Sequence, residues 1–459
     1  MEMLDGSVIA TALPQMAQTF HDNPVNLGIG MSSYLLTLAI FIPSSGWIAD
    51  RFGSKTIFLS AIAVFTVASV LCGISGSLPE FTAARILQGI GGAMMVPVGR
   101  LVVLRGSDKR DLVNMMQFIS TPGLIAPMLG PPVGGFITTF SSWRWIFFLN
   151  VPIGIVGLAL VAAFMVNHKA DVSRSFDWMG FILSGAGLAS LLFGLDQLGR
   201  PSIGTAFTVT LIAAGVVICA VAFVHLRRTE HPLLDLTLFR IPTFSITTLF
   251  GGTGFRVVIG TTPFLWPLLL QVGFGMSAFV SGSVIIACAI GDFGMKFFSK
   301  RVLRRFGFRQ TLFVNGVLVA LAILSCAALG PSTPLAVIVL VFFLVGVFRS
   351  IQFGSFNALT YGDISPERMS AASSLAGTIQ QMSFGLGVAF GALALHLAAL
   401  ANRNVADGFT VADFRWAFVI TAALALYSAF AFRRLAPDAG AEASGHLLAE
   451  PVSPAALAG

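Results

Sequence analysis

Residues 46–59 read GWIADRFGSKTIFL, a short basic turn between two long apolar runs. Part of this turn recurs later in the chain, because RFGSKTIFL at 51–59 is matched by RFGFRQTLF at 305–313. Chance similarity is the alternative in a Phe-rich chain, but both copies lead from a basic loop into a new apolar segment. The repeat indicates two related halves, an organisation typical of transporters whose substrate site lies between the repeats.

The composition is that of a membrane protein. Of the 459 residues, 56% are hydrophobic and only 10% are charged, whereas soluble proteins carry about 25% charged residues. A chain this apolar cannot cover a water-facing surface, which excludes a large soluble enzyme. The net charge of +7 does not indicate nucleic-acid binding, because the basic residues form short clusters between apolar runs without an aromatic-basic motif.

Motifs for catalysis and for metal binding are absent from the sequence. The chain has no HExxH, phosphate-loop or CxxC motif and no clustered histidines, so we expect neither an enzyme nor a bound cofactor. An ion gradient is then the expected energy source. The four cysteines lie in apolar stretches at scattered spacing, which is typical of small buried hydrophobic residues: Cys72, Cys219, Cys288 and Cys326.

Fourteen apolar segments of mostly helical length predict an α-helical bundle in the membrane, since barrel strands would be about ten residues long. The first segment reaches Pro14 after about a dozen residues, although a spanning helix needs about 20, and it contains the acid Asp5. The repeat offset exceeds six spans, which predicts an additional helical pair at 178–196 and 205–225. The segments lie at about 1–15, 27–48, 56–75, 82–104, 113–138, 145–166, 178–196, 205–225, 245–271, 279–298, 311–330, 335–359, 371–400 and 414–432.

Lys and Arg residues are concentrated in alternate loops. The rich set contains Arg51, Lys55, Arg105, Lys109, Arg110, Lys169, Arg174, Arg227, Arg228, Arg240, Lys300, Arg301, Arg304, Arg305, Arg309, Arg368, Arg433 and Arg434. The poor set contains Arg144, Arg200, Arg403 and Arg415. The positive-inside rule places the rich set, and with it the C-terminus, in the cytoplasm. The tail at 435–459 is rich in Ala, Pro and Gly and is expected to be disordered.

The loop GWIADRFGSKT, residues 46–56, has a physical rationale for each polar or glycine position. Gly46 permits close helix approach, and Asp50 can accept hydrogen bonds from a helix N-terminus or an Arg. Gly53 allows a tight reversal, while Arg51 and Lys55 can anchor the loop to an anionic leaflet. Seen alone, the stretch could equally be an ordinary charged turn.

Several stretches together resemble the major facilitator superfamily. The loop at 46–56 resembles its signature G-x-L-x-D-R-x-G-R-K, with Ile48 and Ser54 as departures. ARILQGIGGA, 84–93, resembles the fourth-helix motif, and APMLGPPVGG, 126–135, resembles the fifth-helix antiporter motif with Ala126 in place of its first Gly. The matching positions are Arg85, Gln88 and Gly89 in the fourth helix and Gly130, Pro131, Gly134 and Gly135 in the fifth.

Two further stretches resemble the fourteen-helix drug/proton antiporter branch of this superfamily: WRWIFFLNVPIG at 143–154 and LDGSVIATALP at 4–14. The second departs from the branch pattern at Gly6, Ser7 and Ala10. In this branch the Leu-Asp pair lies midway along the first helix, so the resemblance implies that about half a helix is missing before Met1. A naturally shortened helix is the alternative.

The resemblance implies the major facilitator fold, with two six-helix bundles and two additional central helices. The implied domains are an N-terminal bundle at 1–166, the additional pair with its linkers at 167–240, a C-terminal bundle at 241–434 and the tail at 435–459. The fifth-helix glycines permit tight packing and a bend, and the resemblance implies that this helix limits proton leak. Structural packing alone is the alternative explanation of the glycines.

Charged side chains inside apolar segments are costly and indicate function. Asp5 is predicted to carry the coupling proton, because burial disfavours the charged carboxylate; a structural pair with an Arg is the alternative. The resemblance implies a role for Arg85 in proton transfer, with static pairing to an acid as the alternative. Asp292 is a further candidate for coupling, although a local ion pair with Lys296, four residues on, is favoured. Two more arginines are expected to pair within the bundle: Arg256 and Arg349.

The function that the resemblance implies is proton-coupled export of amphiphilic drugs, cationic ones included, or of toxic compounds. A cavity lined by Phe and Met with one or two acids could bind many apolar cations. Export of a specific metabolite or siderophore is the alternative, and a non-transporting membrane sensor or a membrane enzyme is the alternative of another class. The expected partners are protons, a small-molecule substrate and the lipid bilayer of the bacterial inner membrane, with a monomer and a membrane-fusion partner both left open.

Overall fold

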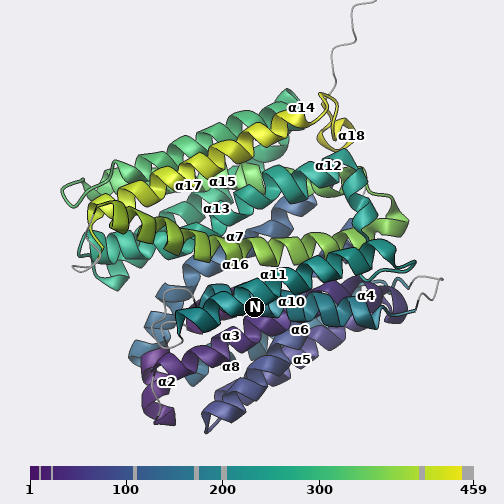
Figure 1. Ribbon diagram of the computed structural model, residues 1–459, viewed down its shortest axis with the longest axis horizontal. Helices are drawn as coiled ribbons and strands as arrows, with labels where there is room; N and C mark the ends of the chain where they lie inside the picture. Colours follow the sequence, from purple (N-terminus) through teal and green to yellow (C-terminus); the bar gives the residue numbers. More distant parts are fainter. Residues whose placement is uncertain are drawn as a thin grey trace, which may run out of the picture.

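The computed structural model describes residues 1–9, 12–21, 24–106, 111–169, 175–197, 204–402 and 409–446. All regular secondary structure in these residues is helical, which confirms the predicted all-α class (Figure 1). The first part of the chain forms α1 (Glu2–Val8), α2 (Leu13–Phe20), α3 (Pro24–Phe41), α4 (Ser45–Phe52), α5 (Ser54–Ile74), α6 (Leu78–Gly106), α7 (Leu112–Phe140), α8 (Arg144–Phe148) and α9 (Asn150–Phe164).

The central and C-terminal parts form α10 (Trp178–Asp196), α11 (Thr205–Arg228), α12 (Pro242–Ser245), α13 (Gly251–Leu268), α14 (Ala278–Ala327), α15 (Leu335–Gly362), α16 (Met369–Ala401), α17 (Val411–Ala431) and α18 (Ala441–Ser444). Short 3₁₀ or π segments connect or extend these helices: η2 (Ile42–Ser44), η4 (Leu236–Arg240), η5 (Ile246–Phe250), η6 (Leu269–Gly273), η7 (Pro366–Arg368) and η8 (Phe432–Arg434).

Eleven helical stretches in the described residues are long and apolar enough to cross a membrane. This confirms a polytopic membrane protein, but the predicted count of fourteen spans is not confirmed. One reason is that α14, with 50 residues, contains two predicted segments that meet at Gly307, where φ is 68°. Another is that the first predicted segment is divided into α1 and α2, of seven and eight residues. Pro14 does not end a helix there but lies in the first turn of α2, where its missing N–H is tolerated.

The predicted additional pair, α10 and α11, lies between the two halves of the molecule (Figure 1). The two helices pack on each other, and α10 also contacts α3 of the first half and α16 of the second. Helix α7 joins the halves directly, because it packs against α14 and α15. The predicted domain boundaries stay a prediction, and residues 170–174 of the first linker lie outside the described residues.

Glycines allow helices to approach at two central crossings. A Cβ on Gly91 of α6 would lie 2.8 Å from the backbone nitrogen of Phe65 in α5. A Cβ on Gly260 of α13 would lie 2.7 Å from the carbonyl oxygen of Phe384 in α16. Membrane helices associate through this kind of close backbone packing, because lipid supplies no hydrophobic drive between them.

The outer surface is apolar, as a lipid-facing surface must be. Large hydrophobic side chains are exposed on it, including Phe140 and Phe164, which are 74% and 81% exposed. The start of the tail, by contrast, packs on the protein: Leu435 and Ala443 are buried, and the His446 ring contacts the Arg304 carbonyl oxygen at 2.9 Å. The expected disorder stays a prediction for residues 447–459, which lie outside the described residues.

Candidate functional site

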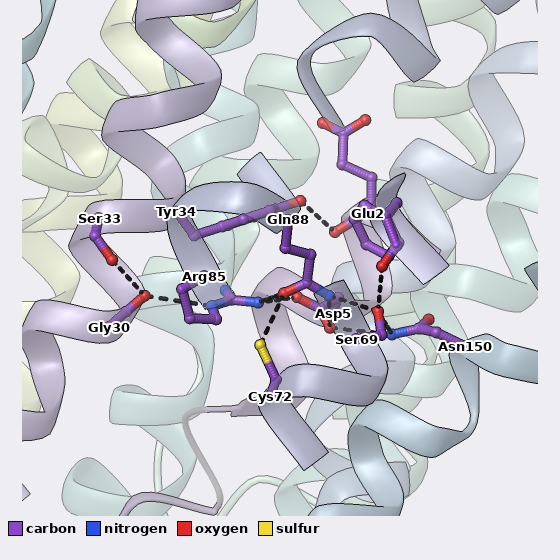
Figure 2. A network of polar contacts seen from close by, with 11 residues as sticks. Glu2, Asp5, Gly30, Ser33, Tyr34, Ser69, Cys72, Arg85, Gln88 and Asn150 are labelled. Atoms are coloured by element: carbon purple, nitrogen blue, oxygen red, sulfur yellow. Dashed lines mark hydrogen bonds and ion pairs between the residues drawn. The ribbon is translucent and has the colours of Figure 1, made fainter. Parts of the chain in front are cut away.

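An ion pair between Asp5 and Arg85 lies at the centre of a buried polar network in the first half (Figure 2). Arg85 Nη1 of α6 donates to Asp5 Oδ2 of α1, and the two side chains are 1% and 0% exposed. The sequence predicted both residues as coupling candidates, and the structure brings them together. Removing both charges from water is unfavourable unless the pair and its hydrogen bonds compensate.

Neutral polar side chains from three helices form hydrogen bonds around the Asp5 carboxylate. Gln88 Nε2 donates to Asp5 Oδ1 at 3.1 Å, and Asn150 Nδ2 donates to the same oxygen at 3.2 Å. The hydroxyl of Ser69 accepts from Gln88 at 2.8 Å and from Asn150 at 3.4 Å. Figure 2 shows these groups converging on Asp5. Sequence reasoning selects Gln88 but misses Ser69 and Asn150. The signal for Ser69 is its polarity within an apolar segment, and Asn150 lies in the family-like stretch 143–154.

The Arg85 guanidinium is held in one orientation by further contacts. Its Nε donates to the Gly30 carbonyl at 3.3 Å, its Nη1 also donates to Gln88 Oε1 at 2.5 Å, and it lies over the Tyr34 ring at 4.1 Å. Gly89 makes this approach of α3 possible, since a Cβ there would lie 2.9 Å from the Tyr34 carbonyl oxygen. The residues of α6 therefore position the Arg85 guanidinium against the Asp5 carboxylate.

The loop at 46–56 connects the two halves at one end of the molecule. Asp50 accepts from Arg105 Nη2 at 2.8 Å and from the Ser370 hydroxyl of α16. The backbone N–H of Gly46 donates to Ser374 Oγ at 2.6 Å, which requires α4 and α16 to lie in close contact. Both predicted roles, close approach at Gly46 and acceptance at Asp50, have structural counterparts here.

The other loop residues serve the turn itself. Gly53 has a φ of 93°, a conformation that favours glycine. Lys55 Nζ donates to the Ala162 carbonyl at 2.8 Å, in the last turn of α9, where a cation complements the helix dipole. Arg51 is exposed, and together with Trp47 it lines a cavity of about 590 Å³.

Both linkers of the additional pair line the same cavity, where the first linker bonds to the second and the second bonds to Arg368 of the second half. Asp177 accepts from His225 at 2.9 Å and from the Leu233 backbone at 3.1 Å. Arg368 Nη2 donates to Asp235 Oδ2 at 2.8 Å, and the Thr237 hydroxyl donates to Asp235 Oδ1 at 2.6 Å.

The stabilisation that Asp235 provides through its contacts with Arg368 and Thr237 should not change with pH over the physiological range. Burial acts to raise the pKa of Asp235, but hydrogen bonds from Thr237 and Arg368 outweigh it and hold the pKa below its usual range. Such a carboxylate stabilises the fold above its unfolded pKa, about 4, and this contribution is lost as pH falls through the lower folded pKa.

We therefore expect Asp235→Asn to destabilise the protein by roughly 1 kcal/mol, equally at pH 5, 6.5 and 8. Thermal unfolding in detergent at the three pH values measures this. A difference between parent and variant that changes across this range would contradict the assignment.

Asp292 belongs to a second buried network in the other half. It forms an ion pair with Arg349 of α15, and the Ser350 hydroxyl donates to its backbone oxygen at 2.7 Å. The favoured local pair with Lys296 is wrong, because Lys296 Nζ instead donates to the Gln117 carbonyl of α7 at 2.7 Å. The expectation that Arg349 pairs within the bundle is confirmed. The same expectation for Arg256 is wrong for an ion pair, because its hydrogen-bond partners among the described residues are neutral: the Thr247 carbonyl and Asn357 Oδ1.

The fifth-helix residues lie in α7, which is one continuous helix. Gly130 and Gly134 are buried, but a Cβ on Gly135 would meet open space, so tight packing is not seen at Gly135. Close contact in this region is instead made by Pro132, which lies 3.1 Å from a Cβ built on Gly282 of α14. The side chain of Pro131 lies outside what the structure describes.

Comparisons with known proteins agree with this architecture. The sequence profile described as Major Facilitator Superfamily matches residues 1–388. A protein of Escherichia coli O6:H1 (strain CFT073) named "Putative multidrug resistance protein MdtD" is 38% identical over 445 residues, covering 95% of this chain and 93% of the relative. Its counterpart in Escherichia coli strain K12 is 37% identical over 441 residues with the same two coverages.

Two solved structures show the same fold at low sequence identity. The human organic anion transporter MFSD10 (TETRAN) has a TM-score of 0.62 at 14% identity, covering 94% of this chain and 96% of that one. The proton:xylose symporter XylE bound to 6-bromo-6-deoxy-D-glucose has a TM-score of 0.62 at 16% identity, covering 96% and 94%.

Proposed function

The chain belongs to the Major Facilitator Superfamily, and from this premise we propose that it is a proton-coupled antiporter that exports amphiphilic drugs or toxic compounds by alternating access. Family membership makes it a multi-pass membrane protein of a transporter fold and not an enzyme. The observation that carries the proposal is the buried carboxylate of Asp5, ion-paired to Arg85 inside the first half.

A carboxylate in this position can couple two fluxes. Protonation of Asp5 neutralises it and removes its attraction to Arg85, so proton binding changes the network that Gln88 and Asn150 share with it. If substrate binding favours the deprotonated network, each ligand lowers the affinity for the other by the same factor. Competition of this kind links proton entry to substrate exit. The name of the MdtD relatives supports drugs or toxic compounds as the substrate class.

Alternating access needs contacts that can break at one end of the molecule. The two halves meet at Gly46 and Ser374, at Asp50 and Ser370, and at Ser373, whose hydroxyl donates to the Pro97 carbonyl at 2.9 Å. Each of these contacts is a side-chain hydrogen bond between helices of different halves, which can break without disrupting either half. They support a state in which this end of the molecule is closed, and which opens when the two halves tilt apart.

Gly46→Ala should disfavour this closed end. The new methyl group would lie 2.7 Å from both the Ser370 carbonyl oxygen and Ser374 Oγ, so α4 and α16 must separate. We expect a several-fold faster thiol labelling of a Ser373→Cys reporter in a background without the natural cysteines. Gly294→Ala is the matched control, because a Cβ there meets open space. Equal labelling rates in the two variants would argue against a closed end at this contact.

We further propose that this closed end is cytoplasmic and that the chain resides in the bacterial inner membrane with its C-terminus inside. The basic loops support this, because the structure joins several of them at one end: Asp50 with Arg105, Asp235 with Arg368, and Asp111 with Lys300. Arg144, from the poor set, instead donates to the Gly73 and Ser75 carbonyls.

Single cysteines test this orientation. Gln310→Cys and Ser141→Cys place thiols at exposed positions, one in the second basic repeat and one beside Arg144. In intact cells, a membrane-impermeant maleimide should label only Ser141→Cys, and permeabilised cells should label both. Labelling of Gln310→Cys in intact cells, or of both positions from one side, would overturn the orientation.

Transport assays in vesicles test the function itself. The full chain is reconstituted into proteoliposomes, a proton gradient is imposed, and a panel of dyes, drugs, metabolites and siderophores is followed. Gradient-dependent movement of several unrelated amphiphiles supports the proposal. Movement of one metabolite or siderophore alone favours the specific exporter, and movement of none favours a sensor. Oligomeric state and a membrane-fusion partner stay open predictions.

A further inference from the structure

Two buried arginines lie between the halves. Arg100 of α6 is 6% exposed and Arg256 of α13 is 0% exposed. Among the residues that the structure describes, neither forms an ion pair, whereas the equally buried Arg85 and Arg349 both do. A buried unpaired cation in a membrane protein is expensive and indicates a function.

Both guanidiniums contact the same face of α15. Arg100 Nη1 donates to the Tyr361 hydroxyl at 3.1 Å, and Arg256 Nη2 donates to Asn357 Oδ1 at 3.2 Å. Tyr361 and Asn357 are four residues apart on one helix, which places them on adjacent turns of one face. The positive charges of Arg100 and Arg256 also act on each other. The two cations therefore form one site rather than two.

The site has more hydrogen-bond donors than acceptors. Arg256 Nε and Asn357 Nδ2 are buried and have no hydrogen-bond partner within the described part of the chain. The remaining acceptors are neutral: Gln380 Oε1 accepts from Arg100 at 3.1 Å, and the Thr247 carbonyl accepts from Arg256 at 3.0 Å. Buried donors are almost always satisfied in proteins, so unsatisfied ones call for a ligand with oxygen acceptors.

One acid lies within electrostatic reach of this site. The carboxylate of Glu2 on α1 is attracted to Arg100 but forms no ion pair with it, and none of the described residues bonds to Glu2 Oε2. A single carboxylate cannot neutralise two guanidiniums. The local charge therefore still favours an additional anion.

The site also lies between the two halves of the molecule. Arg100 belongs to the first half but donates to Tyr361 of α15 and Gln380 of α16 in the second. These bonds must break when the halves separate, which frees the Arg100 fork. A carboxylate matches a guanidinium fork in a bidentate manner, and Phe356, 4.7 Å from the Arg256 guanidinium, adds apolar surface beside it.

We propose that Arg100 and Arg256 bind the anionic group of the exported compound, so that the substrate class is amphiphilic organic carboxylates. This rests on the proposed transport function and makes anions, not cations, the favoured substrates. The anion takes over the bonds that Tyr361, Gln380 and Asn357 accept in this structure. The Asp5 network is then free to handle the proton.

The experiment uses two dyes with the same ring system and opposite charge, fluorescein and rhodamine 6G. Binding to the purified full chain in detergent is followed by fluorescence polarisation, and proton-driven transport is followed in proteoliposomes. Arg100→Gln and Arg256→Gln each remove a charge-assisted contact, so we expect a roughly tenfold or greater loss of fluorescein affinity with little change for rhodamine 6G. Arg433→Gln, which removes an exposed cation over the Phe313 ring, is the matched control and should bind fluorescein as the parent does.

If Arg256→Gln fails to fold, Arg256→Lys takes its place. Lysine keeps the positive charge but lacks the forked donor geometry of the guanidinium, so it should give an intermediate loss of fluorescein affinity. Absence of fluorescein binding to the parent, equal losses for both dyes, or unchanged fluorescein affinity in both Gln variants would overturn the proposal. Failure of the proposed function looks different: fluorescein binds with the expected arginine dependence, but no dye moves with the proton gradient.

Discussion

Asp5→Asn is expected to abolish proton-driven efflux while leaving the protein folded. Asparagine has nearly the size of aspartate and keeps an oxygen that can accept from Arg85, Gln88 or Asn150. It cannot ionise, so the competition between proton and substrate disappears. Some stability is lost as well, because Arg85 remains buried beside a neutral group.

Substrate-induced proton release from the purified protein, measured at several pH values, separates coupling from folding. The parent should release protons on substrate addition, and Asp5→Asn should release none. Asp413→Asn is the matched control: Asp413 is also fully buried but caps α17 through Thr410 and Asn402, and its loss should leave proton release unchanged. Proton release from Asp5→Asn equal to that of the parent would move the coupling site elsewhere, with Asp292 next in line.

Arg85→Lys extends this test to the partner. Lysine keeps the charge but cannot donate to Asp5, Gly30 and Gln88 together, as the guanidinium does. Loss of one such charge-assisted hydrogen bond corresponds to a roughly tenfold slower efflux. An unchanged efflux rate would show that Arg85 serves only as a static counter-charge.

The second large effect concerns stability. Arg349→Met leaves the Asp292 carboxylate buried without its partner, and breaking such a pair costs about 3–5 kcal/mol. Lys296, four residues away on the same helix, is the one nearby cation able to soften this loss among the described residues, but only by leaving the Gln117 carbonyl. We expect a strongly lowered melting temperature in detergent.

The double variant Asp292→Leu with Arg349→Met provides the control. Replacing both charges with apolar groups removes the unpaired carboxylate and should recover most of the lost stability. If the double variant also exports substrate, Asp292 is structural and the coupling role stays with Asp5. A single variant Arg349→Met as stable as the parent would show that the ion pair contributes nothing to folding.

Sequence alone determined the class of the protein and its strongest functional candidates. Apolar segment length and the scarcity of charge are local properties that dictate a helical membrane bundle whatever the tertiary arrangement. The same logic singled out Asp5 and Arg85, because a charge inside an apolar segment stands out without any neighbour. The pattern also separated the two parts of α14 that meet at the non-helical Gly307, but it did not show that the first apolar segment is divided into α1 and α2.

Only the tertiary structure decided which charges meet. Asp292 and Lys296 are four residues apart, yet Asp292 pairs with Arg349 from another helix and Lys296 bonds to α7. Arg100 attracted no notice in the sequence, although it is the arginine that joins the two halves. The physical reason is that helix rotation and packing, set by many distant contacts at once, determine which way a long side chain extends and what it reaches. Sequence spacing describes one helix at a time, whereas these partners lie on helices that meet only in the folded bundle.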